Sequence, residues 1–238
     1  MELSVILPSH SEAKNLKEIL PNIHSVLEQM NIDYEILVID TMLPIDDTKI
    51  ICEKKGVICI PRENGNLYGD AIRTGFKYSK GKFVVTMDAD GSHNPSDIML
   101  FYTKIKNNCD LIIGSRYIEG GKTHNGFILK AMSWVLNLSY SIVFRLRVKD
   151  VSNSYRMYKG DQIRGLRLEC NNFDIVEEIL IKLSLSKDQY KILEVPVNFA
   201  KREEGKSKRN LWIFVFSYIQ TMIRLYIIKR NINLGDNK

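Results

Sequence analysis

The first 115 residues alternate short apolar segments rich in β-branched residues with longer segments in which apolar residues recur at helical spacing. This alternation is typical of a mostly parallel sheet covered by helices on both faces. We therefore predict an α/β fold, and a chain of 238 residues is long enough for one good core. The predicted strands are 4–7, 34–40, 57–60, 83–88 and 111–114, and the predicted helices are 15–30, 45–55, 68–79 and 95–107.

Ligands of open α/β sheets bind outside the carboxyl ends of the strands, so the residues at these ends are the first candidates for a site. Here they are 8–12, Asp40, 88–90 and 114–116. The segment 8–12 contains no glycine, and no glycine-rich phosphate loop occurs elsewhere, which argues against a dinucleotide-binding or P-loop domain. Phosphates bound here must be held by a cation and by basic side chains.

The strongest single motif is an apolar strand that ends in Asp88-Ala89-Asp90. Side chains alternate along an extended chain, so both carboxylates can face the same divalent cation. Mg²⁺ or Mn²⁺ held there would neutralise a diphosphate that departs from a sugar. The simpler alternative is a capped acidic turn with no ligand.

The formal net charge of +6 is concentrated in the C-terminal part of the chain, where five basic residues gather within nine positions. They are Lys201, Arg202, Lys206, Lys208 and Arg209. Such a cluster favours an anionic partner. Motifs for nucleic-acid binding are missing, so we expect no nucleic acid and favour phosphate on a nucleotide or a lipid. Arg202 can hold phosphate through two parallel hydrogen bonds, and Lys208 through its point charge.

Two apolar stretches, 127–148 and 211–228, carry polar residues at helical spacing. A basic Arg224 makes spanning a membrane costly for the second stretch. We expect both to lie as amphipathic helices in a membrane interface; the alternative is packing on the catalytic domain. The expected organisation is a catalytic domain over 1–210 followed by a C-terminal helix and tail over 211–238.

The compartment follows from two negative features of the sequence. The four cysteines have no metal-ligand or CxxC spacing and are expected to be free thiols, which favours a reducing compartment. The N-terminus enters a strand directly, without the basic region of a signal peptide. We expect a cytoplasmic protein at the cytoplasmic face of a membrane, attached peripherally or through a separate membrane protein.

Several motifs in order resemble those of family-2 glycosyltransferases with the GT-A fold, specifically the polyprenol-phosphate branch typified by dolichol-phosphate mannosyltransferases. The resemblance extends from residue 3 to about residue 208. Its motifs are VILPSHSEAKNL at 5–16, VID at 38–40, DADGSHNP at 88–95, GSRY at 114–117, DVSNSYRMY at 150–158, and EVPVNF at 194–199 with the following RxxGxSK.

This resemblance implies roles for named residues. Those implied to bind the donor are Pro8, His10, Glu12, Asp40, Asp88, Ala89, Asp90, Arg202 and Lys208. The implied metal ligands are Asp88, Asp90 and Ser92, the last standing where the family often has Gln. The implied acceptor-phosphate residues are Arg116, Lys130 and Ser154, and the implied catalytic residues are Asp90, Arg116 and Arg202. The chain departs from the family pattern at Ser11, 41–45, Leu67, Ser92 and Asn153.

The implied reaction is transfer of a hexose, mannose or glucose, from GDP-mannose or UDP-glucose to a polyprenyl phosphate, with inversion at the sugar. Two alternatives stay open. One is a family-2 enzyme that glycosylates a sugar hydroxyl of a polysaccharide precursor. The other is a non-catalytic scaffold subunit that binds the donor, which the departures from the family pattern favour.

Overall fold

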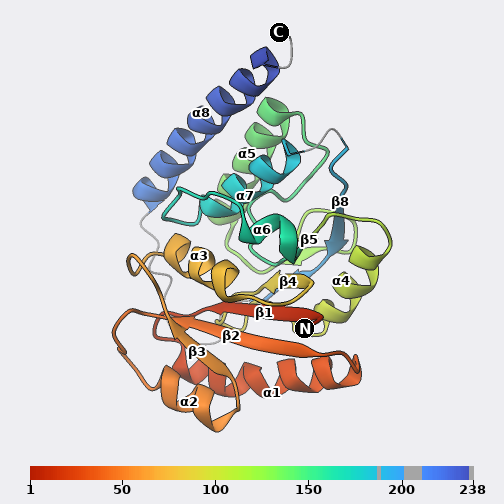
Figure 1. Cartoon of the computed structure of the whole chain (residues 1–238). Coiled ribbons are helices and arrows are strands. Elements are labelled where there is room, and N and C mark those ends of the chain that lie inside the picture. Colours follow the sequence, from red (N-terminus) through yellow and green to blue (C-terminus); the bar gives the residue numbers. More distant parts are fainter. Residues whose placement is uncertain (187–188, 201–210, 236–238) are drawn as a thin grey trace.

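The structure is a computed structural model that describes residues 1–186, 189–200 and 211–235, and its centre is a seven-stranded sheet (Figure 1). Its strands are β1 (Leu3–Pro8), β2 (Tyr34–Asp40), β3 (Ile58–Pro61), β4 (Phe83–Thr86), β5 (Leu111–Ser115), β7 (Arg156–Lys159) and β8 (Ile192–Pro196). They lie in the order β3-β2-β1-β4-β7-β5-β8. Two short strands, β6 (Lys122–Thr123) and β9 (Asn198–Phe199), pair separately.

Helices cover both faces of the sheet, which confirms the predicted α/β fold. They are α1 (Ala13–Gln29), α2 (Thr48–Lys54), α3 (Tyr68–Tyr78), α4 (Asp97–Lys106), α5 (Phe127–Phe144), α6 (Gly160–Arg164), α7 (Ile175–Ser184) and α8 (Leu211–Gly235). Alternate residues of β1 divide between two cores: Val5 and Leu7 pack with α1 and α4, whereas Ile6 packs with α3 and α7. The two cores lie on opposite faces of the sheet, because successive side chains of a strand point to opposite faces.

Strand β7 is antiparallel to both of its neighbours, β4 and β5. Met157 is aligned with Val85 on one side and with Ile112 on the other. Because β7 runs in the opposite direction, its first residue lies at the edge where β4 and β5 end. The segment 150–155 therefore reaches that edge, and the Thr86 hydroxyl donates to the Ser154 carbonyl at 2.6 Å.

At two of the predicted boundaries that differ from the structure, a side chain binds the backbone. Helix α2 begins at Thr48, because the Asp46 carboxylate accepts the backbone N–H groups of Thr48 and of Ala13, each at 3.0 Å. Residues 45–47 thus tie the start of α2 to the start of α1. Strand β4 ends at Thr86, because the Asp88 backbone N–H donates to His93 Nδ1 at 3.0 Å and draws the chain into a turn.

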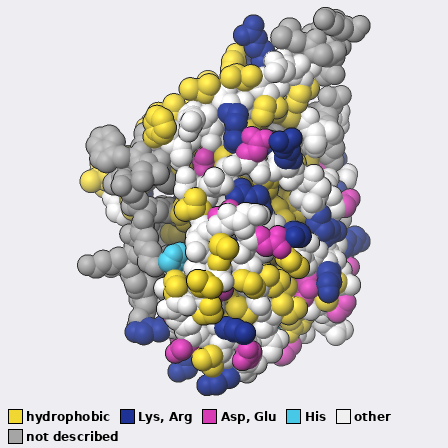
Figure 2. All heavy atoms as spheres, turned by 60° about the vertical axis from the view of Figure 1, so that its left-hand side comes forward, with side chains coloured by type: hydrophobic (Ala, Val, Ile, Leu, Met, Phe, Trp, Pro, Cys, Tyr) yellow, Lys and Arg dark blue, Asp and Glu magenta, His cyan; other side chains and the backbone are white. Residues whose placement is uncertain are grey.

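Helices α5 and α8 pack against each other at the end of the molecule opposite α1 and α2 (Figure 1). Some of their polar residues face inward: Asn137 and Thr221 are buried, and the Tyr140 hydroxyl donates to the Tyr218 carbonyl at 3.0 Å. Many of their apolar residues face outward, and Figure 2 shows hydrophobic side chains with Lys and Arg among them over this upper region. The exposed apolar residues are Phe127, Ile128, Leu129, Trp134, Val135, Leu138 and Ile142 on α5, and Phe216, Ile219, Ile223, Tyr226, Ile227 and Ile232 on α8.

Helix α5 has a further property. By length and composition alone, it is the one helix in the described part of the chain that could cross a membrane, with a mean hydropathy of 1.4 over 18 residues. The predicted division of the chain at residue 210 lies outside the described residues and stays a prediction.

Candidate active site

The candidate site lies at the edge of the sheet where β1, β2, β4 and β5 end. The structure places Asp40 at the end of β2, Asp88 and Asp90 just after β4, and Arg116 just after β5. Ser154 arrives from the opposite direction, immediately before the antiparallel β7. The sequence predicted Asp40, Asp88, Asp90 and Arg116 at the ends of parallel strands, which agrees with the topology. The presence of Ser154 at the same edge follows from the antiparallel direction of β7.

Asp88 is held through one of its two carboxylate oxygens. Its Oδ1 accepts the Ser154 hydroxyl at 3.0 Å and the Tyr68 hydroxyl at 3.4 Å. Both donors use the same oxygen, so Oδ2 is the atom that this geometry leaves for a ligand. The carboxyl group is therefore oriented by neighbours without being fully used by them.

Asp90 is buried and closes a tight turn with Ser92. Its Oδ1 accepts both the hydroxyl of Ser92, at 2.5 Å, and the backbone N–H of Ser92, at 3.0 Å. Gly91 between them has φ +79°, a conformation that L side chains rarely adopt. The Ser92 hydroxyl proton is thus directed at Asp90, which leaves the oxygen lone pairs of Ser92 for a cation or its water shell.

His93 fixes the back of this turn and is fully buried. Its Nδ1 accepts the Asp88 backbone N–H, so the proton lies on Nε2, which donates to Asn153 Oδ1 at 3.2 Å. Burial lowers the pKa of His93 and favours the neutral ring that this pattern requires. The ring also stacks on Tyr155 with 4.6 Å between centroids. Asn153, a departure from the family pattern, is therefore an integral support of the acidic turn.

The donor set fits a hard divalent cation. Asp88 and Asp90 contribute carboxylate oxygens and Ser92 a hydroxyl, which are the ligand types that Mg²⁺ and Mn²⁺ prefer. No group of three or more His, Cys, Asp or Glu residues that could hold a metal occurs within the described residues. That observation is compatible with Mg²⁺, which is commonly bound by one or two carboxylates together with substrate phosphates and water.

Arg116 is engaged by another residue of the protein. Its Nε and Nη2 donate to the two oxygens of Asp150 at 2.8 and 2.7 Å, and its backbone N–H donates to Asp150 as well. Both side chains are buried. Burial alone would lower the pKa of Arg116, but the negative charge of Asp150 and its hydrogen bonds outweigh this effect and raise the pKa. The expectation that Arg116 contacts phosphate stays a prediction, and any such contact must share the guanidinium with Asp150.

The ends of β1 and β2 carry buried polar atoms that have no partner among the described residues: Ser9 Oγ and Asp40 Oδ1. Burial raises the pKa of Asp40. Beside them, the Arg62 guanidinium donates hydrogen bonds to the backbone carbonyls of Ser9, Asn66 and Leu67. Arg62 thus holds the loops together, while Ser9 and Asp40 offer hydrogen-bonding groups to a ligand.

The remaining predicted residues differ in how they are placed. Pro8 and Glu12 are buried, and Glu12 accepts the Asn15 side-chain N–H at 2.6 Å. His10 is exposed beyond β1, Ala89 is buried in the acidic turn, and Lys130 is exposed in the first turn of α5.

Arg202 and Lys208 lie outside the described residues. The last described residue before them, Ala200, donates its N–H to the Ser92 carbonyl at 2.9 Å. The described chain before these two basic residues therefore ends beside the acidic turn.

Sequence reasoning missed three residues that shape the site: Tyr68, Asp150 and Phe173. Tyr68 contacts Asp88, Phe173 stacks on Tyr68 with 4.1 Å between ring centroids, and Asp150 binds Arg116. Asp150 begins one of the recognised motifs, so it carried a local signal. No local signal pairs Tyr68 with Phe173, because the contact joins distant parts of the chain.

Comparison with known proteins gives consistent results. The family model described as glycosyl transferase family 2 matches residues 4–167. A dolichol-phosphate mannosyltransferase of Pyrococcus furiosus is 33% identical over 94% of this chain, which spans 64% of that relative's length. An undecaprenyl-phosphate mannosyltransferase of Micrococcus luteus is 29% identical, with 87% of each chain covered.

Solved structures are similar in fold. Glucosyl-3-phosphoglycerate synthase of Mycobacterium tuberculosis, in complex with Mn²⁺, UDP-glucose and phosphoglyceric acid, superposes with a TM-score of 0.73. The sequence identity is 16%, with 94% of this chain and 79% of that chain covered.

Proposed function

Because the chain belongs to glycosyl transferase family 2 and is a glycosyltransferase, we propose that it transfers mannose from GDP-mannose to a polyprenyl phosphate at a membrane surface. Curated relatives over most of the chain are named for mannosyl transfer to dolichol phosphate and undecaprenyl phosphate. The observation that carries the proposal is that the outward faces of α5 and α8 carry many exposed large apolar side chains, while Asn137 and Thr221 are buried. That arrangement suits an enzyme whose acceptor is a lipid.

The acidic turn is the proposed site of a divalent cation. Asp88 Oδ2, Asp90 and the oxygen of Ser92 would hold Mg²⁺ or Mn²⁺, which supplies charge neutralisation for the departing nucleoside diphosphate. The structure supports this by fixing both carboxyl groups in advance: Ser154 and Tyr68 orient Asp88, and Ser92 orients Asp90. Fixed groups need not reorganise during the reaction.

The nucleoside of the donor is proposed to lie over the ends of β1 and β2. Ser9 and Asp40 present buried polar atoms there that have no partner within the described ranges, and Pro8, His10 and Glu12 flank them. Hydrogen bonds from a base or ribose would satisfy these atoms. Arg202 and Lys208 are proposed to bind the donor phosphates, since their segment begins at Ala200, which is bonded to Ser92.

The acceptor needs little activation. A lipid phosphate is already anionic at neutral pH, so its oxygen can attack the anomeric carbon without a strong general base. In-line attack inverts the configuration at that carbon, and the sugar–phosphate bond breaks as the new one forms. Lys130, in the first turn of α5, and Ser154, beside Asp88, are the proposed contacts of the acceptor phosphate. Arg116 is proposed to contribute positive potential while Asp150 keeps it in place.

Attachment to the membrane is proposed to be interfacial, through the outward apolar faces of α5 and α8. Lys229 lies over the Phe144 ring, 5.7 Å from its centroid, so a basic group accompanies the apolar surface. Apolar burial and attraction to anionic lipid then act together.

A transfer assay tests the function. The protein would be incubated with radiolabelled GDP-mannose, and in parallel with labelled UDP-glucose, in the presence of Mg²⁺ or Mn²⁺ and polyprenyl phosphate. Metal-dependent label in the organic phase, from GDP-mannose, is the expected result. Label from UDP-glucose alone would correct the donor. Donor consumption only with a water-soluble sugar acceptor would favour the hydroxyl-directed alternative, and donor binding without any transfer would favour a scaffold.

A further inference from the structure

We infer that Tyr68 is a positioning residue for Asp88, and that Phe173 and helix α8 hold Tyr68 in place through the loop between α6 and α7. This loop comprises residues 165–174 and is called the α6–α7 loop below. The inference rests on the proposed function, because the proposed function assigns Asp88 to the metal site.

Tyr68 stands at the first position of α3 and points its hydroxyl at Asp88 Oδ1, 3.4 Å away. The Ser154 hydroxyl, in the segment that precedes β7, donates to the same oxygen at 3.0 Å. Two donors from separate elements fix the rotation of the carboxyl group and keep Oδ2 available. Loss of one donor leaves that rotation less restricted, which disfavours a cation that requires defined geometry.

Phe173 fixes the ring of Tyr68. The two rings are stacked, with 4.1 Å between centroids and 18° between planes. The backbone of the α6–α7 loop also binds the start of α3: the Gly69 N–H donates to the Asn171 carbonyl at 2.8 Å. A Cβ at Gly69 would lie 2.3 Å from the Cys170 carbonyl oxygen, so only glycine permits this approach.

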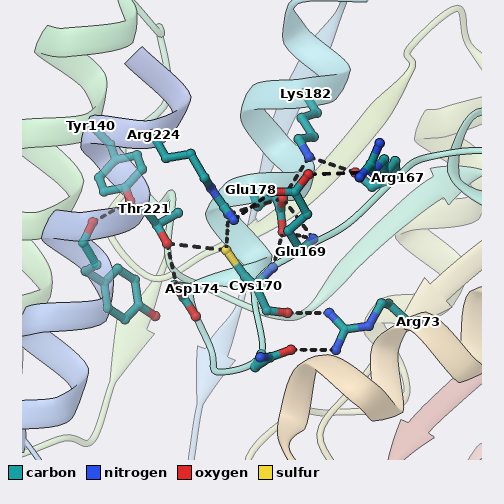
Figure 3. Close-up of polar contacts among 12 residues, drawn as sticks. Arg73, Tyr140, Arg167, Glu169, Cys170, Asp174, Glu178, Lys182, Thr221 and Arg224 are labelled. Atoms are coloured by element: carbon teal, nitrogen blue, oxygen red, sulfur yellow. Dashed lines mark hydrogen bonds and ion pairs between the residues drawn. The ribbon is translucent and has the colours of Figure 1, made fainter. Parts of the chain in front are cut away.

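Arg73, one helical turn further along α3, also binds the α6–α7 loop. It donates to the Cys170 carbonyl and, at 2.8 Å, to Asn171 Oδ1 (Figure 3). The N-terminal part of α3 and the α6–α7 loop are thus joined by an aromatic stack, a backbone hydrogen bond and two hydrogen bonds from the Arg73 guanidinium. A displacement of the loop would move Tyr68 with it.

Helix α8 holds the other side of the same loop (Figure 3). The Thr221 hydroxyl donates to Asp174 Oδ2 at 2.6 Å. The Arg224 guanidinium contacts Cys170 Sγ at 2.8 Å and Glu169 Oε2 at 3.1 Å. Asp174 directly follows Phe173, so the contact to Thr221 restrains the residue next to the stacked ring. The inward polar residues of α8 therefore anchor the α6–α7 loop, while the outward face of α8 is apolar.

Binding of Mn²⁺ tests the inference without requiring turnover. Free Mn²⁺ would be measured by electron paramagnetic resonance in the presence of GDP, and separately of UDP, for the full chain and its variants. Tyr68→Phe keeps the ring and removes the hydroxyl. Phe173→Leu removes the stack, and Thr221→Val removes the hydrogen bond to Asp174. The matched controls are Thr221→Ser, which keeps the hydroxyl, and Thr103→Val, at an exposed position of α4.

We expect Tyr68→Phe to weaken Mn²⁺ binding about tenfold, the lower end of the loss that follows removal of a residue that orients a metal ligand. Phe173→Leu should weaken it to a similar extent, and Thr221→Val by a smaller factor. Both controls should match the wild type, and Tyr68→Phe should keep the wild-type unfolding midpoint, which a purely structural role would shift.

Two results would contradict the inference in different ways. Wild-type Mn²⁺ affinity in Tyr68→Phe would show that Tyr68 does not position Asp88, and the proposed metal site would survive. A wild-type protein that binds no Mn²⁺ with either nucleotide would overturn the metal site itself, and the role of Tyr68 with it.

Discussion

The guanidinium of Arg116 and the carboxylate of Asp150 form a two-point ion pair that is almost completely buried. Asp150 is in turn held by Glu194 on β8, which accepts its backbone N–H at 2.9 Å. The pair joins the end of β5 to the segment that leads into β7. It therefore stabilises the junction at which the two halves of the site meet.

Breaking this pair should be costly. Asp150→Asn leaves a buried arginine without its counter-charge, and we expect the free energy of unfolding to fall by about 3–5 kcal/mol. Denaturant titration measures this directly. Lys77→Met, which removes an exposed ion pair with Glu63, is the control and should leave the midpoint nearly unchanged. A small effect of Asp150→Asn would mean that solvent reaches Arg116.

Asp90→Asn separates charge from shape at the proposed metal site. The amide oxygen can still accept the Ser92 N–H and hydroxyl, so the fold and the unfolding midpoint should be kept. Transfer should fall by at least about a thousandfold, comparable to losing a main electrostatic contribution to the transition state. The measurement is the transfer rate at saturating Mn²⁺. A variant with the wild-type rate would contradict the role of Asp90.

Glu177 should make stability depend on pH. It is fully buried, neither carboxylate oxygen has a hydrogen-bond partner among the described residues, and burial raises its pKa well above 4.5. Between 4.5 and that raised pKa the folded state binds more protons than the unfolded state, so stability falls as pH rises. The slope is limited to about 1.4 kcal/mol per pH unit for one proton.

Glu177→Gln removes this titration. The variant should gain stability relative to the wild type as pH is raised from 5 to 8, which urea titrations across that interval would show. Glu18→Gln, at an exposed position of α1, is the matched control and should follow the wild type. Parallel curves for Glu177→Gln and wild type would show that Glu177 stays ionised in the fold.

The outward face of α5 should govern binding to lipid vesicles. Phe127 and Trp134 are 85% and 60% exposed, and each loses apolar burial when replaced by Ser. We expect each replacement to cost about 2 kcal/mol, or roughly thirtyfold in the partition constant. Flotation with vesicles that contain anionic lipid measures this. Ile50→Ser, on α2 at the other end of the molecule (Figure 1), should bind as the wild type does.

The sequence predicted the elements of the first half well, because hydrophobic periodicity is a local property. Strands β1 and β2 and helices α1 and α3 lie within two residues of their predicted bounds. Helix α2 begins three residues later than predicted, because the Asp46 carboxylate accepts two backbone N–H groups. Strand β4 ends two residues earlier than predicted, because His93 accepts the N–H of Asp88.

Local sequence patterns do not reveal which residues far apart in the chain contact each other. The GSRY motif predicts an arginine at the site but does not reveal that Asp150 occupies its guanidinium. Periodicity likewise showed that α5 and α8 have a polar stripe without showing where it faces. The structure turns Asn137 and Thr221 inward, where each accepts or donates a buried hydrogen bond. The orientation depends on partners in other elements, and no local pattern contains them.

The position of β7 has a consequence for biosynthesis. Strands β4 and β5 share no hydrogen bonds, and β7, which comes later in the chain, joins them. A nascent chain that has emerged only as far as α5 can pair β3, β2, β1 and β4, but it leaves the edge of β4 open. Asp88 and Arg116 are then brought into register only when residues 156–159 insert between their strands. The pairing of β7 therefore joins the two parts of the candidate site and covers the open edge of β4, whereas β5 stays an edge strand until β8 pairs with it.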